Sequence, residues 1–222
     1  MAVQLFYSIE RRTDYSSKST YNLSVKSTWI YILGAIGLIA AGVVALSLGH
    51  MLGRGNELYG TEVQNPPDLN TLLLRHVDRG TVTLADFEAS LLLVFFGYTQ
   101  CPDICPLTLA KLVKVYDDFG KTEDIQVVMI TIDPDHDTPE VIQRYVSSFH
   151  PEFIGLGGSN TEIARAARTF FIGYQKTVSD QFNHTDAIAI LDSRRRLRYF
   201  YNQEHVTRLV EDLPKLLLRR DF

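Results

Sequence analysis

Two cysteines, Cys101 and Cys105, are the only thiols in this 222-residue chain; they stand four residues apart, each followed by a proline. They follow an apolar run that ends at Gly97 and precede a stretch with helical spacing. The positive end of a helix dipole favours a thiolate, and an i, i+4 spacing in the first turn puts both sulfurs on one side. We therefore expect a redox pair or a site for a soft cation such as Cu(I), rather than two inert buried cysteines.

A histidine, His184, stands directly before a second apolar run, Ala187–Leu191. Imidazole nitrogen is a good ligand for copper and zinc, so it could complete a Cys-Cys-His set. A lone histidine is more often structural than a ligand. Its assignment therefore depends on a fold that brings this loop opposite Cys101 and Cys105.

The elements that would position these side chains alternate along the chain. Continuous apolar runs at 91–97 and 126–132 predict strands buried on both faces of a sheet. A helix from Pro139 has a marked start, since Asp137 can cap it and Glu140 completes a capping box. The other expected elements are strands at 81–84 and 153–156, a hairpin of 187–191 and 197–201, and helices at 107–119, 161–170 and 206–218.

This order predicts an α/β domain with a thioredoxin-like fold, in which right-handed crossovers build a parallel portion and an antiparallel hairpin closes it. In that architecture the loop entering the hairpin faces the two cysteines. Disulfide oxidoreductases of this fold carry a cis-proline there, but this chain has no proline between Pro151 and Pro214. His184 stands there instead, which favours a metal site formed by Cys101, Cys105 and His184.

A long uncharged segment lies near the N-terminus, since no charged residue occurs between Lys26 and Arg54. About 20 apolar residues in a helix cross a bilayer core of ~30 Å, and the run from Trp29 to Gly49 has that length. A buried core helix would show an amphipathic stripe, and a cleaved signal peptide has an apolar region of only ~7–15 residues. We therefore expect an uncleaved N-terminal transmembrane helix.

The basic residues around this segment set its expected orientation. Four lie on its N-terminal side, whereas only Arg54 lies within the fifteen residues after it. We expect residues 1–28 to form a tail in the cytoplasm or mitochondrial matrix, 29–51 the transmembrane anchor, 52–68 an extended linker and 69–222 the domain on the outer side. The four N-terminal basic residues are Arg11, Arg12, Lys18 and Lys26.

The remaining charge points mostly to structural roles. The formal net charge is −4 and no stacking motif is present, which argues against nucleic-acid binding. The cluster Asp133, Asp135, His136 and Asp137 is typical of turn and cap chemistry rather than of a hard-cation site, although Asp133 could orient the metal loop. The basic run is expected to be a solvated face, or a patch for an acidic partner or anionic headgroups. It comprises Arg194, Arg195, Arg196 and Arg198.

Five segments resemble the Sco/SenC family of copper-binding, thioredoxin-fold proteins, over roughly residues 65–218. The cysteine loop, Val94–Leu109, resembles the family's metal loop almost residue for residue and is the most specific of the five. A departure lies beside the histidine, where Asn183 stands in place of the family's aspartate. The other segments are Val82–Phe87, Thr131–Val141, Phe149–Leu156 and the loop around His184.

The resemblance implies that Cys101, Cys105 and His184 bind one copper ion per chain, as Cu(I) or Cu(II). It implies a copper chaperone that helps to build the CuA centre of cytochrome c oxidase, with oxidase subunit II and copper donor proteins as partners. Together with the anchor, it implies an inner-membrane protein whose domain faces the periplasm, or the intermembrane space in a mitochondrion.

Two other functions stay open from the sequence. The same cysteines could act as a redox pair in a membrane-anchored thiol–disulfide reductase of the CuA cysteines, which would be an enzymatic role. They could also serve copper or redox sensing without any transfer. A peroxidase would need a peroxide-positioning Thr/Arg arrangement, which the sequence does not show.

Overall fold

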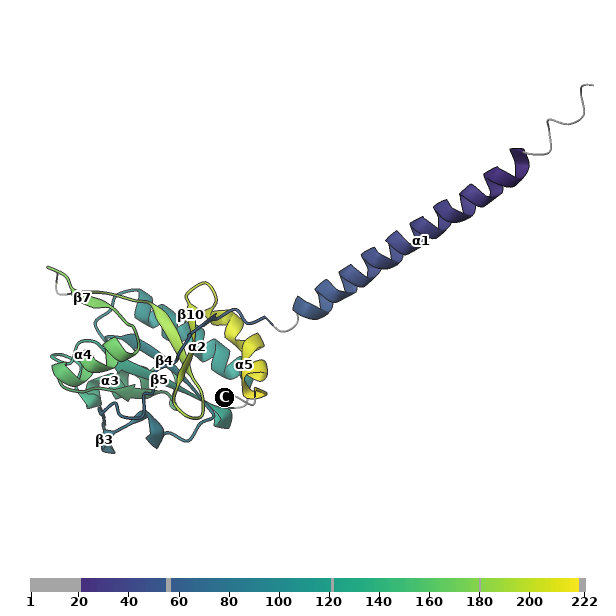
Figure 1. Ribbon diagram of the computed structural model, residues 1–222. Helices are drawn as coiled ribbons and strands as arrows, with labels where there is room; N and C mark the ends of the chain where they lie inside the picture. Colours follow the sequence, from purple (N-terminus) through teal and green to yellow (C-terminus); the bar gives the residue numbers. More distant parts are fainter. Residues whose placement is uncertain (1–20, 55–56, 121, 180, 220–222) are drawn as a thin grey trace, which may run out of the picture. The chain divides into compact units, whose positions relative to one another are not determined.

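The computed structural model describes residues 21–54, 57–120, 122–179 and 181–219 (Figure 1). The chain divides into two compact units, Met1–Glu57 and Leu58–Phe222. The first contains helix α1, Tyr21–Arg54. Within α1 the segment Trp29–Gly49 is long and apolar enough to cross a bilayer, and its side chains are exposed. The basic residues Arg11, Arg12 and Lys18, which carry most of the expected orientation, lie outside the described residues.

The second unit is built on a six-stranded sheet with the order β1-β10-β9-β4-β5-β6. Strands β4, β5 and β6 are parallel, whereas β9, β10 and β1 continue the sheet in antiparallel pairs. The strands are β1 Thr61–Glu62, β4 Leu91–Gly97, β5 Ile125–Thr131, β6 Ile154–Leu156, β9 Ala187–Leu191 and β10 Leu197–Asn202; two small hairpins add β2 Leu74–His76 with β3 Gly80–Val82, and β7 Tyr174–Lys176 with β8 Phe182–His184.

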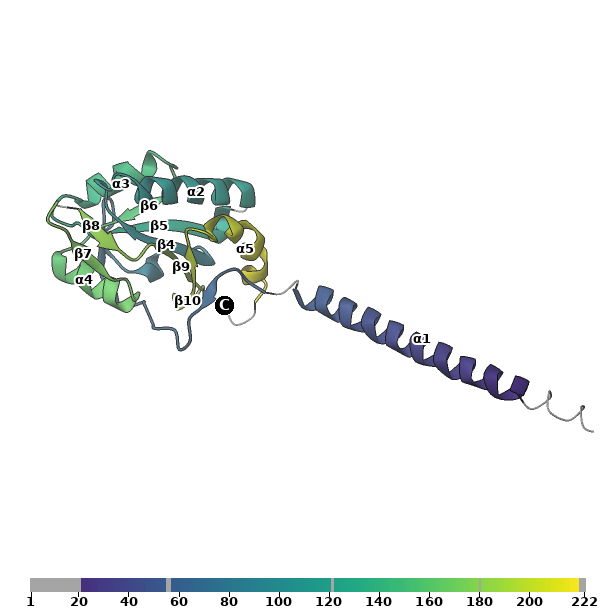
Figure 2. The same ribbon diagram turned by 90° about the horizontal axis from the view of Figure 1, so that it is seen from above.

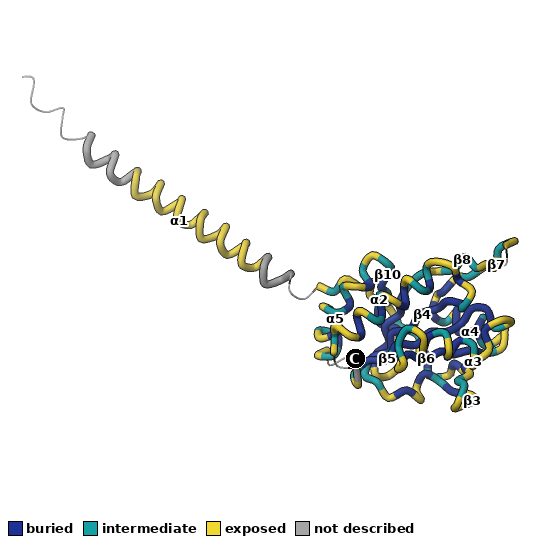
Figure 3. The backbone as a smooth tube through the Cα atoms, turned by 180° about the vertical axis from the view of Figure 1, so that it is seen from behind, coloured by how far each residue is buried: buried dark blue, intermediate teal, exposed yellow. Residues whose placement is uncertain are grey.

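Helices cover both faces of this sheet. Figure 2 shows α2 and α3 on one side and α4 on the other. The central strand β4 is buried along its whole length (Figure 3), as the continuous apolar run predicts. The helices are α2 Ile104–Phe119, α3 Pro139–Ser147, α4 Asn160–Thr169 and α5 Leu209–Leu217, with short 3-10 turns at Leu84–Asp86, Thr122–Asp124 and Val206–Arg208. The thioredoxin-like α/β fold is therefore confirmed.

The start of α3 differs from the expectation that Asp137 caps it. The capping residue is Thr138, whose side chain accepts a hydrogen bond from the backbone N–H of Val141 at 3.4 Å. Asp137 is 1% exposed and turns inward, where its carboxylate accepts hydrogen bonds from Thr131 Oγ1 at 2.7 Å and the Thr99 backbone N–H at 3.0 Å. A buried carboxylate needs such donors, whereas a threonine in extended backbone serves equally well as a cap.

The segment expected to be a spacer packs partly against the domain. Thr61 and Glu62 pair with β10, and the Val63 backbone N–H donates to the Arg198 carbonyl at 2.8 Å. The Tyr59 backbone N–H donates to the carboxylate of Asp212, which is fully buried, at 2.6 Å. We call residues 58–63 the strap, since they fasten the start of the unit to β10 and α5.

The basic run is a structural cluster rather than a solvated face, because only Arg194 is exposed. Its counterpart is Asp192, which is fully buried and accepts hydrogen bonds from the guanidinium groups of Arg196 at 2.8 Å and Arg198 at 3.2 Å. The backbone N–H groups of Arg194 and Arg196 also donate to this carboxylate. The charges are thus used to close the turn between β9 and β10.

Arg195 completes this cluster by reaching back to an earlier part of the chain. It is 5% exposed and adopts a positive φ of 60°, which lets its side chain point inward from the turn. Its guanidinium donates to the carbonyl groups of Leu84, at 3.0 Å, and Phe87. Arginine is therefore required at this position for its fork of donors rather than for surface charge.

Replacing Asp192 with asparagine is expected to lower the free energy of unfolding by about 3 kcal/mol, because it removes the buried negative charge that the guanidinium groups of Arg196 and Arg198 contact. Urea unfolding followed by circular dichroism measures this. The control is Asp118→Asn, which breaks an exposed pair with Lys114 of 2.7 Å and should cost no more than about 0.5 kcal/mol. If both variants lowered the free energy of unfolding by the same small amount, the buried Asp192 cluster would stabilise the fold no more than an exposed ion pair does.

Candidate metal centre

The two cysteines lie at the connection between the end of β4 and the start of α2. Cys101 is in the connecting turn and Cys105 is in the first turn of the helix, and both are free thiols. The side chain of Asp103, the residue before the helix, makes no capping hydrogen bond. The Cys101 sulfur takes that place, since it accepts a hydrogen bond from the Cys105 backbone N–H at 3.4 Å. The helix start thus holds both sulfurs together, as their spacing predicts.

The cysteine turn is supported from two sides. A methyl group at Gly97 would lie 2.9 Å from the Cys105 sulfur and 2.8 Å from the Phe95 ring, so only glycine leaves room for the sulfur there. On the other side, Asp137 fixes Thr99 through its backbone N–H and its hydroxyl. The sequence suggested Asp133 for this task. The structure instead gives it to Asp137.

His184 ends strand β8 and is half-buried. Its Nε2 atom lies 3.9 Å from the Cys105 sulfur. Its Nδ1 atom lies 3.1 Å from the carbonyl oxygen of Thr185, and because a carbonyl can only accept, Nδ1 is the donor in this contact. In the tautomer that this contact favours, Nε2 presents its lone pair to the cysteine. The structure thus places His184 beside Cys105, and Cys105 beside Cys101.

The spacing of these donors fits a metal ion of the first transition row. Bonds of ~2.3 Å to sulfur and ~2.0 Å to nitrogen at a trigonal or tetrahedral centre place the two ligand atoms roughly 3.5–3.8 Å apart. The observed 3.9 Å between Cys105 and His184 is close to that span. Among the described residues no three His, Cys, Asp or Glu side chains yet form a closed metal-binding group.

Burial is the main influence on the Cys105 thiol. It has no exposed surface, and this burial, followed by the hydrogen bond with the Cys101 side chain, raises its pKa far above the ordinary value. Cys101 retains 8% of its surface. Cys101 is therefore the thiol that an incoming ligand meets first, while Cys105 keeps its proton until a metal ion displaces it.

A carboxylate that the sequence did not single out lies near the thiols. The negative charge of Asp186 is among the causes that raise the pKa of Cys105, and its Oδ1 atom accepts a hydrogen bond from Gln203 at 3.0 Å. Asn183, by contrast, is exposed, because adjacent residues of strand β8 face opposite sides. Asn183 therefore does not share the face of the imidazole, and Asp186 is a carboxylate whose charge acts on Cys105.

The acidic cluster after β5 serves the fold, as expected. His136 Nδ1 lies 2.8 Å from the Asp133 carboxylate, and Asp135 accepts a hydrogen bond from Asn160 at 3.0 Å. Asp137 is held by the two threonines described above. Each member thus has protein partners that account for its position.

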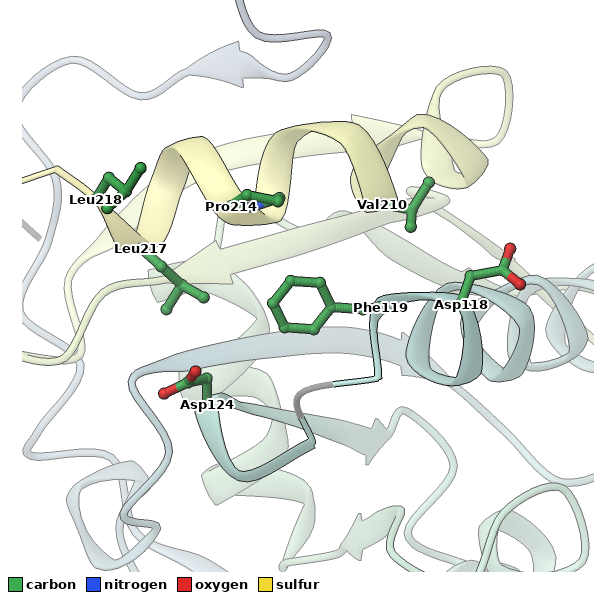
Figure 4. A pocket seen from close by; sticks show the side chains of 7 residues that line it. All are labelled: Asp118, Phe119, Asp124, Val210, Pro214, Leu217 and Leu218. Atoms are coloured by element: carbon green, nitrogen blue, oxygen red, sulfur yellow. The ribbon is translucent and has the colours of Figure 1, made fainter.

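A groove of about 400 Å³ lies far from the cysteines, between α5 and the C-terminal end of α2 (Figure 4). Cys105 and Phe119 are at opposite ends of α2, about 20 Å apart along the helix axis. The groove is therefore no part of the metal centre. Its lining residues are Asp118, Phe119, Asp124, Val210, Pro214, Leu217 and Leu218.

Comparison with known proteins bears on this site. Residues 73–218 match the SCO1/SenC family. The chain is 34% identical over 136 residues to the SCO2-like protein of Rickettsia felis, a match that covers 58% of this chain and 66% of the relative. The chain spans about half to two thirds of the length of the curated relatives it matches.

Solved structures share the fold of the second unit. Apo Sco1 from Thermus thermophilus superimposes with a TM-score of 0.65 and 35% identity, covering 72% of this chain and 98% of that one. ScoI from Arabidopsis thaliana with copper bound gives a TM-score of 0.60 and 28% identity, covering 71% and 99%. The residues matched by the SCO1/SenC family, 73–218, include Cys101, Cys105 and His184.

Proposed function

This chain belongs to the SCO1/SenC family, and on that basis we propose that it binds one copper ion through Cys101, Cys105 and His184 and delivers it during assembly of the CuA centre of cytochrome c oxidase. One observation carries this proposal. The Nε2 atom of His184 lies 3.9 Å from the Cys105 sulfur, although the two residues are far apart in sequence.

The donor set suits an ion that is carried and then released. Two thiolates bind Cu(I) well, and the imidazole adds the nitrogen that Cu(II) prefers. Cys101 is partly accessible whereas Cys105 has no exposed surface. An acceptor would therefore displace Cys101 or His184 first, while Cys105 holds the ion until the exchange is nearly complete.

The proposal includes a membrane location. Helix α1 contains the segment Trp29–Gly49, which is apolar and long enough to span a bilayer. The excess of lysine and arginine before this segment favours an orientation with the copper domain on the periplasmic side, or in the intermembrane space of a mitochondrion. This is the compartment from which the CuA site of oxidase subunit II is reached.

A transfer assay tests the proposal. Two equivalents of the chain, one loaded with Cu(I) and one with Cu(II), are mixed with the apo CuA domain of subunit II, whose cysteines have been reduced. Formation of the binuclear, mixed-valence CuA centre is followed by its absorption and EPR signals. The expected result is CuA formation with stoichiometric loss of copper from the chain. Tight copper retention, with no CuA signal even in excess, would contradict delivery and leave sensing as the better explanation.

A second function, thiol–disulfide reduction, is supported by the contact between Cys101 and Cys105. In that reaction the more accessible Cys101 would attack a disulfide of the acceptor, and Cys105 would resolve the mixed disulfide. Two thiols become one disulfide here while the target disulfide becomes two thiols. The raised pKa of Cys105 makes the resolving step slow at neutral pH. Mixing the metal-free reduced chain with oxidised CuA domain separates this role from delivery.

Copper binding is expected to strengthen with pH. The pKa of Cys105 is raised in the folded chain, so its thiol stays protonated through the neutral range and bound copper must displace that proton. The apparent Cu(I) affinity should therefore rise by up to about tenfold per pH unit from this proton alone. Competition with a Cu(I) chelator between about pH 6.5 and 8.5 measures the slope. The slope should fall by about one proton in Cys105→Ser, and an unchanged slope would contradict the assignment.

A further inference from the structure

Tyr98 lies between the cysteine turn and the strand that carries His184. It directly follows β4, and its side chain is 2% exposed. Its backbone carbonyl accepts a hydrogen bond from the Cys101 N–H at 3.3 Å, so its main chain belongs to the cysteine turn. Its hydroxyl accepts a hydrogen bond from the backbone N–H of Phe182 in β8, also at 3.3 Å. One residue thus bonds both halves of the metal centre.

The Tyr98 ring also packs under β8. It contacts Phe182 with a centroid separation of 5.2 Å and an interplanar angle of 66°. It meets the His184 ring edge-on, at 6.4 Å and 83°. Because alternate residues of a strand share a face, Phe182 and His184 both face Tyr98 while Asn183 faces solvent. The position of the imidazole therefore depends on this ring.

The hairpin that presents His184 is separate from the main sheet. In the described part of the chain, strands β7 and β8 pair with each other, through the register Tyr174–His184 to Lys176–Phe182, and Tyr174 and Phe182 at its base pack against the core. Figure 1 shows this hairpin extending from the edge of the domain. Val178, close to its turn, is fully exposed. An isolated two-stranded hairpin is marginally stable in water, so the contacts at its base decide where it lies.

We propose that Tyr98 is a positioning residue that holds His184 within reach of the cysteine thiols. The hydrogen bond from the Phe182 N–H to the Tyr98 hydroxyl sets the distance between β8 and the cysteine turn. The edge-on ring contact sets the orientation of the imidazole. This inference rests on the proposed copper site, but the anchoring itself belongs to the metal-free chain. Copper in the Cu(II) state, which depends on the imidazole nitrogen, should therefore respond to Tyr98 more strongly than Cu(I) does.

The test uses the full chain in detergent with Tyr98→Phe and Tyr98→Leu. Loss of the hydroxyl alone should weaken Cu(II) binding between about two- and tenfold, the range of one hydrogen bond. Loss of the ring as well should weaken it more than about tenfold and change the EPR spectrum of bound Cu(II) as the nitrogen ligand is lost. Cu(I) affinity should change by less than about threefold, because both sulfurs remain.

The matched control is Tyr116→Phe. Tyr116 lies in the C-terminal half of α2, away from the cysteines, and is also 2% exposed. Its hydroxyl donates a hydrogen bond to the Glu152 carboxylate at 2.6 Å. This variant loses a comparable buried hydrogen bond, so a general loss of stability would appear in both. It should leave the Cu(II) EPR spectrum unchanged. If Tyr98→Phe and Tyr98→Leu, both folded by circular dichroism, keep the wild-type spectrum and affinity, Tyr98 does not position His184.

A metal-free measurement separates this proposal from the copper function. Hydrogen exchange of the Phe182 amide reports its bond to the Tyr98 hydroxyl in the absence of any ion. We expect faster exchange in Tyr98→Phe and unchanged exchange in Tyr116→Phe. That result supports the anchoring even if the wild-type chain were to bind no copper, in which case the proposed function alone would fail. Unchanged exchange in Tyr98→Phe would overturn the anchoring.

Discussion

Replacing Cys101 and Cys105 together with serine is expected to abolish copper binding, from about one Cu(I) per chain to near zero. Serine hydroxyls are hard donors that stay protonated at neutral pH, so the soft ion loses both of its anionic ligands. His184 alone offers one neutral nitrogen. The measurement is an anaerobic Cu(I) titration of a soluble fragment that begins at Arg54 and so retains the strap.

The single variants decide how the two sulfurs share this role. Cys101→Ser keeps the fully buried sulfur and Cys105→Ser keeps the more accessible one, and each should weaken Cu(I) binding without changing the circular dichroism spectrum. Retention of tight, stoichiometric copper by the double variant would mean that the metal centre lies elsewhere. Loss of copper together with loss of the folded signal would require the titration to be repeated with alanine at both positions.

Replacing His184 with alanine is expected to weaken Cu(II) binding by more than about 100-fold, whereas Cu(I) binding weakens far less. Residues that merely support a ligand typically cost 10–100-fold in metal affinity, so removal of a ligand should exceed that range. Two thiolates are enough to bind Cu(I) stably, whereas Cu(II) prefers a site that includes nitrogen. The EPR spectrum and the thiolate-to-Cu(II) absorption band of the loaded chain report the change.

A second histidine provides the control for this experiment. His205 lies beside Tyr59 of the strap, with ring centroids 6.0 Å apart. Its described ring contact is thus with the strap and not with the cysteine turn. His205→Ala should therefore leave both copper states unchanged. Full Cu(II) affinity in His184→Ala would contradict the three-ligand centre and would favour a two-sulfur site of the reductase type.

The sequence predicted the core of the fold because its signals are local. The run Leu91–Gly97 is a strand with the expected bounds, since an uninterrupted apolar segment of that length can only be buried on both faces. Helix α2 begins at Ile104 rather than at the expected residue 107, because its first turn is capped by a sulfur, which no capping motif describes. The neighbourhood of Cys101 and Cys105 was therefore predictable, but the way they are held was not.

The parts that the sequence did not predict depend on distant partners. Strand β8 is short and polar, and only its pairing with β7 and its contact with Tyr98 make it a strand. The basic run predicted a solvated face, but in the fold two of its arginines form ion pairs with the buried carboxylate of Asp192. Asp137 has the spacing of a helix cap, yet its partners lie elsewhere: Thr99 follows β4, and Thr131 ends β5.

The strap makes the stability of the domain depend on residues that precede its central strands. The Tyr59 backbone N–H is one of the donors to the buried carboxylate of Asp212, and Thr61 and Glu62 pair with β10. A cut inside the strap would remove that donor and leave β10 as an unpaired sheet edge. Proteolysis there is therefore expected to weaken the folded domain although it leaves Cys101, Cys105 and His184 in place.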